Sequence, residues 1–103
     1  MPASLAAAIL ERLAGLPAAA VGVLRWAAVL GAELSMTDLD LVTGRPTGEL
    51  AELLEAAMAA GVVAEAGAGR LGFRHALIRQ VLYEGIPGPV AGGLHVQAAR
   101  ARR

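Results

Sequence analysis

Apolar residues recur three or four positions apart in several separate stretches of the sequence. The stretches are Leu5, Ile9 and Leu13; Val21, Leu24 and Ala28; Leu50, Leu53, Leu54 and Ala57; and Leu77, Ile78, Val81 and Leu82. A glycine follows each of the first three stretches, where it can end a helix. The pattern predicts amphipathic helices with one apolar face each, and the helix around Leu24 is expected to be the most buried.

A further short helix is predicted to begin at Thr37 and to end at Gly44. Asp40 follows Thr37 by three positions, which is a carboxylate variant of the capping box. The next residues, Arg45 and Pro46, favour an extended link, because the residue before a proline avoids the helical region. Thr47 is therefore predicted to cap the helix that contains Leu50.

The period of the pattern changes after this helix. Residues 62–65 form a short stretch with two valines, and alanine and glycine alternate over residues 66–69. After this turn, Leu71 and Phe73 alternate with polar or small neighbours. This is typical of a β-hairpin with one apolar face. A helical period returns over residues 75–86, before a Pro-Gly-Pro sequence ends it.

The order helix, short helix, longer helix and hairpin predicts a mainly α-helical chain with a small β-hairpin. It is the connectivity of a winged helix, in which a helix-turn-helix is followed by a hairpin called the wing. We therefore divide the chain into a leading helix (1–15), a winged-helix domain (16–86), and a C-terminal helix or frayed tail (87–103). Gly92 and Gly93 weaken that last helix by about 1 kcal/mol each relative to alanine.

Composition supports one helical domain and restricts its partners. The chain has 103 residues, 56% of them hydrophobic, and only three are aromatic, so alanine supplies much of the apolar mass. Nine arginines balance nine acidic residues, and lysine and cysteine are absent. Without a positive field, non-specific binding to DNA is disfavoured. Without cysteine, disulfides and thiolate metal sites are excluded.

Residues 13–32 form the most apolar stretch, but Pro17 and Arg25 interrupt it. We interpret it as a buried core helix rather than a membrane span. No basic segment leads into an apolar one at the N-terminus, so no signal peptide is expected, and the expected location is the cytoplasm.

The helix before the hairpin lacks the residues of a DNA reader. In DNA-binding winged helices this element enters the major groove and presents arginine, lysine, asparagine or glutamine. Here it runs from Thr47 to Ala60, and its charged residues are Glu49, Glu52 and Glu55. DNA binding is disfavoured, and the alternative of a DNA-binding winged helix depends on Arg70 and Arg74 of the hairpin.

The remaining motifs do not support catalysis. Residues 67–72 match the dinucleotide fingerprint G-x-G-x-x-G, but they lie in a hairpin rather than at the start of a helix in a βαβ unit. A Walker A motif is excluded because the chain has no lysine. His75 and His95 are too far apart for helical metal ligands. Ser4 and Ser35 lack a nucleophile-elbow context. We predict no enzyme activity and no metal site.

His75 is the strongest candidate for binding. It lies where the hairpin turns into a helix, and the N–H groups at a helix start attract anions. Arg74 precedes it, and Arg79 follows one turn later. Two interpretations stay open: a phosphate site, or a partly buried histidine that caps the helix or bonds to a hairpin carbonyl.

Residues 71–83, LGFRHALIRQVLY, resemble the FRHALxRxxxY stretch that closes the winged-helix domain of STAND-type signalling ATPases. The resemblance is strongest to the large ATP-binding LuxR-family transcriptional regulators related to the maltose regulator. Residues 13–17 and 24–31 resemble the start of that domain, and residues 53–63 its LxxAxxAGLV segment. The similarity covers residues 5–86, whereas the glycines after Pro89 replace the Arg-rich helix that is usual in the family.

The resemblance implies a function that composition does not. In that family the winged-helix domain folds against an upstream nucleotide-binding domain, and a histidine contacts the phosphate of bound ADP. His75 matches that histidine, with Arg74 beside it, whereas Ala76 replaces the aspartate of many relatives. The implied role is regulatory, with ATP or ADP bound by the parent protein and no cofactor in this segment. A domain separated from its parent exposes apolar surface, which favours a homo-oligomer.

Overall fold

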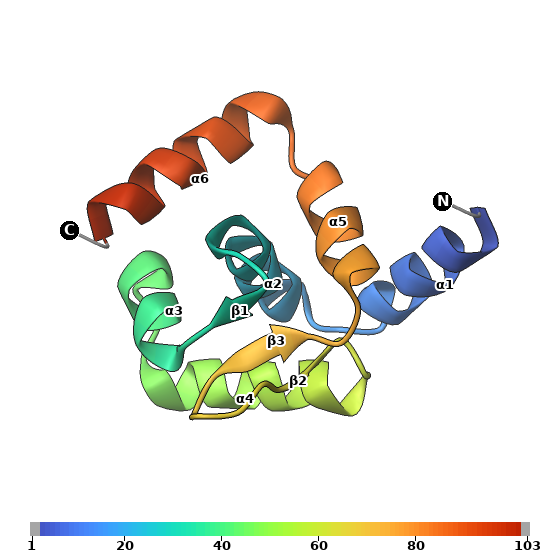
Figure 1. Cartoon of the computed structure of the whole chain (residues 1–103), viewed down its shortest axis with the longest axis horizontal. Helices are drawn as coiled ribbons and strands as arrows, with labels where there is room; N and C mark the ends of the chain where they lie inside the picture. The colour runs from blue at the N-terminus through green and yellow to red at the C-terminus, as the bar shows by residue number, and fades with distance from the viewer. Residues whose placement is uncertain (1–2, 102–103) are drawn as a thin grey trace.

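The computed structural model describes residues 3–101, which form a mainly helical fold with a small antiparallel sheet (Figure 1). The elements in chain order are α1 (Ala3–Ala14), α2 (Ala18–Leu30), β1 (Glu33–Leu34), α3 (Met36–Thr43), α4 (Thr47–Ala59), β2 (Val63–Glu65), β3 (Leu71–Phe73), α5 (Ala76–Glu84) and α6 (Gly88–Ala101). The prediction of a mainly α-helical chain with a small β element is confirmed.

Helix α2 is the centre of the core, and it contacts α3, α4, α5 and α6. Its buried residues are Ala20, Val23, Leu24, Ala27, Ala28 and Val29. They lie on more than one face of the helix, because neighbours cover it on several sides. The expectation that this helix is the most buried is confirmed among the described elements.

The sheet contains one strand more than the predicted hairpin. β2 and β3 pair antiparallel, with Val63 opposite Phe73, as the hairpin prediction requires. β1 pairs with the other edge of β3, which gives the order β1-β3-β2. β1 was missed because its two residues are too few to show an alternating pattern, and only its partner strand defines it.

The first turns of α3 and α4 differ from the predicted caps. Ser35, not Thr37, caps α3, since its Oγ accepts a hydrogen bond from the N–H of Asp38 at 3.2 Å. Pro46 occupies the cap position of α4, where no side-chain cap forms, and Thr47 is the first helical residue. The capping predictions for both threonines are therefore wrong. The predicted stop at Gly44 is confirmed, with the left-handed φ of 68° that favours glycine.

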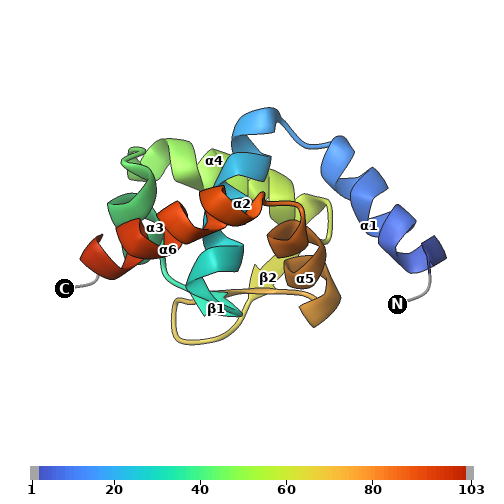
Figure 2. The same ribbon diagram turned by 90° about the horizontal axis from the view of Figure 1, so that it is seen from above.

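Helix α6 runs from Gly88 to Ala101, so these residues take the helical alternative rather than that of a frayed tail. Residues 102 and 103 lie outside the described part of the chain. Ala91 and Ala98 are buried, and Gln97 donates from Nε2 to the carbonyl oxygen of Val42 at 3.1 Å. Seen from above, α6 crosses over the body of the fold (Figure 2). These tertiary contacts offset the weak helix propensity of its glycines.

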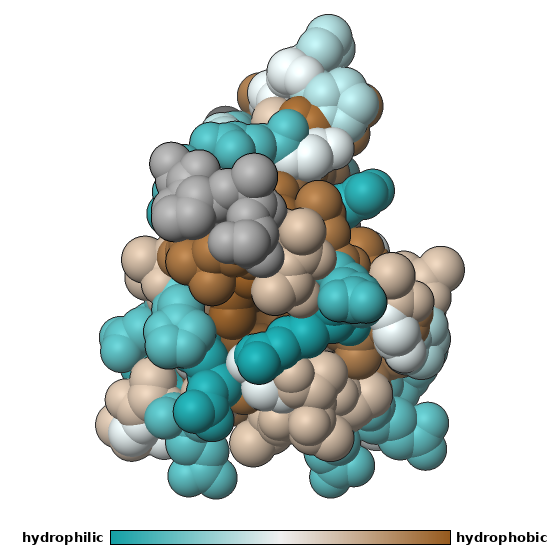
Figure 3. Space-filling view, turned by 90° about the vertical axis from the view of Figure 1, so that its right-hand side faces the viewer, coloured by the Kyte–Doolittle hydropathy of each residue, from teal (hydrophilic) through white to brown (hydrophobic). Residues whose placement is uncertain are grey.

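Helix α1 extends from the body at the side opposite the C-terminal end of α6 (Figures 1 and 2). Ile9 and Leu13 are buried in the core, whereas Leu5 and Leu10 are 47% and 56% exposed. The face on this side of the molecule carries apolar surface between polar side chains (Figure 3). α1 is thus attached by one apolar stripe and leaves other apolar residues in contact with water.

Candidate functional site

His75 lies between β3 and α5, at the residue that precedes the first turn of the helix. Its backbone is extended, with φ −140° and ψ 139°, and its ring forms no capping hydrogen bond. Two backbone bonds fix the corner: the N–H of Arg74 donates to Val62 at 3.0 Å, and the carbonyl of His75 accepts from the N–H of Ile78 at 3.0 Å. The side chain is exposed. The ring is therefore neither buried nor used as a helix cap.

A hollow of about 470 Å³ lies beside His75, between α5 and α1. Helix α1 contributes Leu5, Ala8, Ile9 and Arg12, and the start of α5 contributes Ala76, Leu77 and Ile78. The four α1 residues follow the i, i+3, i+4, i+7 spacing of one helix face. The hollow thus has an apolar wall, and Arg12 and His75 are the two lining residues with polar side chains.

Arg12 was missed by the sequence analysis. It follows the apolar Ile9 by three residues and precedes the buried Leu13, so its place at the edge of the α1 stripe could be read from periodicity. The packing of that stripe against the start of α5 could not, because it joins residues more than sixty positions apart in the sequence. The fold alone brings Arg12 and His75 to one hollow.

Arg74 does not share this hollow. Its exposed side chain lines a separate hollow on the hairpin, with Glu65 and Phe73 among its neighbours. Consecutive side chains in an extended backbone point to opposite sides, and His75 directly follows Arg74 in such a segment. The structure therefore does not place the two candidate residues around one ligand position.

Arg79 lies one turn beyond His75, but its side chain is already bound. Its Nε donates to the carbonyl oxygen of Ala28 at 2.9 Å. Ala28 is among the last residues of α2, whose final carbonyls have no partner within the helix. Arg79 thus completes the C-terminal end of α2, which is also the end that favours a positive charge.

The lining of the hollow is suited to binding an anion. Its lining contains two nitrogen-bearing side chains and no carboxylate, hydroxyl or thiol among the described residues. The first N–H groups of α5 add positive potential at the same place. An anionic group such as a phosphate would find hydrogen-bond donors here, with apolar surface beside them for an uncharged part of the ligand.

The exposed face of α4 carries the opposite charge. Glu49, Glu52 and Glu55 are all exposed, and α4 contains no basic residue. Arg45 forms an ion pair with Glu49 at the start of the helix. A phosphate backbone against this face would meet carboxylates rather than cations.

Residues 3–101 contain neither a cluster of metal-ligating side chains nor a helix that could span a membrane. There, no three His, Cys, Asp or Glu side chains gather into a group that could hold a metal ion. None of the helices in this range combines the length and hydropathy needed to cross a membrane.

Comparison of the chain with protein-family models, with curated proteins and with solved structures gave no match.

Proposed function

We propose that this chain is a non-catalytic, regulatory winged-helix domain of a bacterial STAND-type, ATP-dependent transcriptional regulator of the LuxR family. In the proposal it couples the nucleotide state of an upstream domain to activation in the cytoplasm. The order of elements supports the fold assignment. α2, β1, α3, α4, β2 and β3 follow one another as in a winged helix, with α3 and α4 as the helix-turn-helix and the hairpin as the wing.

The observation that carries the proposal is the exposed imidazole of His75 beside an open hollow. An ADP phosphate that belongs to another domain can reach a sensor only if the ring faces outward, and His75 is exposed at the start of α5. Arg12 lines the same hollow, and the N–H groups of Ala76 and Leu77 in the first turn of α5 would add further donors there. In the proposal His75 contacts the phosphate, and Arg74 adds only long-range positive charge.

The domain division follows from this role. Residues 1–15 would connect the upstream nucleotide-binding domain to the winged helix in residues 16–86. The segment after residue 86 would lead to the rest of the regulator. α1 supplies one wall of the hollow, so movement of this connection would change the phosphate position directly.

The test uses the full-length protein that contains this chain, loaded with ADP. His75→Ala should accelerate ADP release by about tenfold to a hundredfold, because a hydrogen bond to a charged group contributes about 1.5–3 kcal/mol. It should also raise basal transcription. His95→Ala is the matched control, since His95 is the other histidine and contacts Tyr83 rather than the hollow. Equal ADP release from the His75 variant and the wild type would refute the sensor role.

A DNA-binding winged helix is the second candidate, favoured by the exposed Arg70 and Arg74 on the hairpin. It predicts salt-sensitive binding of a DNA duplex that is lost in Arg70→Ala/Arg74→Ala. The regulatory proposal predicts no binding in the same titration at moderate salt, because the helix that would enter the groove is acidic.

A further inference from the structure

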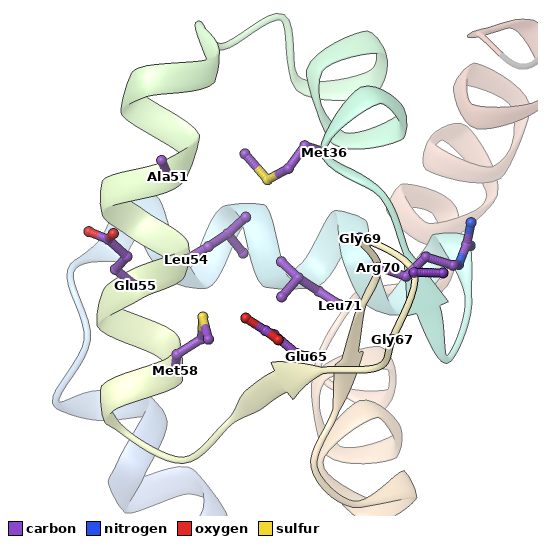
Figure 4. Close-up of a pocket in the computed structure, with 11 residues that line it drawn as sticks. Met36, Ala51, Leu54, Glu55, Met58, Glu65, Gly67, Gly69, Arg70 and Leu71 are labelled. Carbon is purple, nitrogen blue, oxygen red and sulfur yellow. The ribbon is translucent and has the colours of Figure 1, made fainter.

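Another hollow, of about 410 Å³, lies between α4 and the β2–β3 hairpin (Figure 4). Its floor consists of side chains from three elements: Met36 of α3, Leu54 and Met58 of α4, and Leu71 of β3. We call this hollow the methionine groove. It lies apart from the His75 hollow and shares no lining residue with it.

The floor of the methionine groove is apolar and open to water. Leu54 is buried, Met36 and Leu71 are half-buried, and Met58 is 38% exposed. Figure 4 shows the side chains of Met36, Leu54 and Leu71 directed into the same space. Methionine is unbranched and polarisable, so surfaces rich in it adapt to partners of different shape.

The mouth of the methionine groove is acidic. Glu55, Glu65 and Arg70 line it and all three are exposed, so the carboxylates outnumber the single cation. Neither Glu55 nor Glu65 forms an ion pair or a side-chain hydrogen bond within residues 3–101, so both carboxylates are available to a cation from outside. Figure 4 shows the side chain of Glu65 directed into the opening, whereas Arg70 points away from it.

The hairpin tip leaves room for a partner beside the methionine groove. Gly67, Ala68 and Gly69 have φ values of 82°, 49° and 72°, a left-handed run that turns the chain sharply. The turn is closed by backbone hydrogen bonds in both directions between residues 66–67 and Arg70. Space is open around both glycines, since a Cβ there would meet no atom within 4 Å.

We propose that the methionine groove docks an amphipathic helix of a partner protein that carries arginines beside its apolar anchors. A leucine or methionine of that helix would lie on Met36, Leu54 and Met58, and its arginines would pair with Glu55 and Glu65. An apolar, methionine-lined groove recognises the apolar face of a helix. The charge at the mouth selects a basic helix over an acidic one, and over a nucleic acid. This docking surface is independent of the proposed nucleotide function.

The experiment follows the methyl signals of Met36 and Met58 by NMR in the whole chain labelled with ¹³C-methyl methionine. The probe is a synthetic helical peptide with leucines on one face and arginines along both edges. The comparison peptide has glutamate in place of every arginine. The basic peptide should shift both methyl signals to saturation, and the acidic peptide should bind at least about tenfold more weakly.

Charge reversal tests the mouth of the groove directly. Glu55→Arg/Glu65→Arg should weaken binding of the basic peptide by at least about tenfold and should favour the acidic one. Glu11→Arg/Glu84→Arg on α1 and α5 is the matched control, because it changes the net charge equally outside the methionine groove. Circular dichroism establishes that each variant is folded.

Three outcomes would overturn the proposal. The first is the absence of a shift at both methyl groups with the basic peptide. The second is equal binding of the two peptides, which would make the contact a non-specific apolar one. The third is a saturable shift of both methyl signals by a DNA duplex alone at moderate salt, which would assign the groove to nucleic acid.

Discussion

The Nε of Arg79 donates a hydrogen bond to the carbonyl oxygen of Ala28 at 2.9 Å, across 51 positions of sequence. Ala28 itself is fully buried, and its carbonyl belongs to the last turn of α2. The bond joins α5, which carries His75 at its start, to the helix at the centre of the core. It therefore fixes the position of the candidate site relative to the rest of the fold.

Arg79→Ala should destabilise the protein by about 1–3 kcal/mol, because it leaves a carbonyl at a buried helix end without a partner. Urea unfolding followed by circular dichroism measures the change. Gln80→Ala is the control: Gln80 makes only an exposed hydrogen bond to Glu84, and its loss should cost below about 0.5 kcal/mol. Equal midpoints for the two variants would show that the Arg79 bond is not structural.

Removal of the serine cap of α3 should be more costly than removal of the nearby threonine. Ser35→Ala deletes the acceptor of the Asp38 N–H and should cost about 0.5–2 kcal/mol. Thr37→Ala changes an exposed residue within the first turn and should be nearly neutral. Thermal unfolding of both variants measures the two losses of stability. A larger loss for Thr37→Ala than for Ser35→Ala would instead support the threonine cap predicted from the sequence.

Substitution by alanine should change the stability of the protein in opposite directions at two glycines, Gly92 and Gly44. Gly92 lies within α6, exposed and with no atom within 4 Å of an added Cβ, so Gly92→Ala should stabilise the protein by about 0.5–1 kcal/mol. Gly44 has a left-handed φ of 68°, so Gly44→Ala should destabilise it by about 1–2 kcal/mol. Denaturant midpoints measure both. A neutral Gly92→Ala would mean that α6 does not form in solution.

The lining of the hollow beside His75 predicts which arginine contributes to phosphate binding with this histidine. Titration with pyrophosphate should shift the ring signals of His75 in the NMR spectrum. Arg12→Ala should weaken this binding by about threefold to tenfold, because Arg12 lines the same hollow. Arg74→Ala should leave it nearly unchanged, since Arg74 lines a different one. A larger effect from Arg74 than from Arg12 would contradict the arrangement of the side chains.

The sequence predicted the local features of the candidate site and missed the long-range ones. The position of His75 between a hairpin and a helix followed from the change of period near Phe73. Its exposure did not, because a polar residue at an element boundary is compatible with either environment. Arg12 and Arg79 show the same limit. Both are visible as arginines on helices, but their partners belong to other elements.

The sequence by itself determined the first five helices, the hairpin and the acidic character of α4, since periodicity, turn residues and charge act over a few neighbouring positions. The tertiary structure decided that β1 joins the sheet, that Arg79 completes α2 and that Arg12 and His75 line one hollow. It also decided that Met36 and Met58 share one groove. Each of these depends on which apolar faces meet. That choice is made by burial summed over the whole chain, which no single stretch of sequence contains.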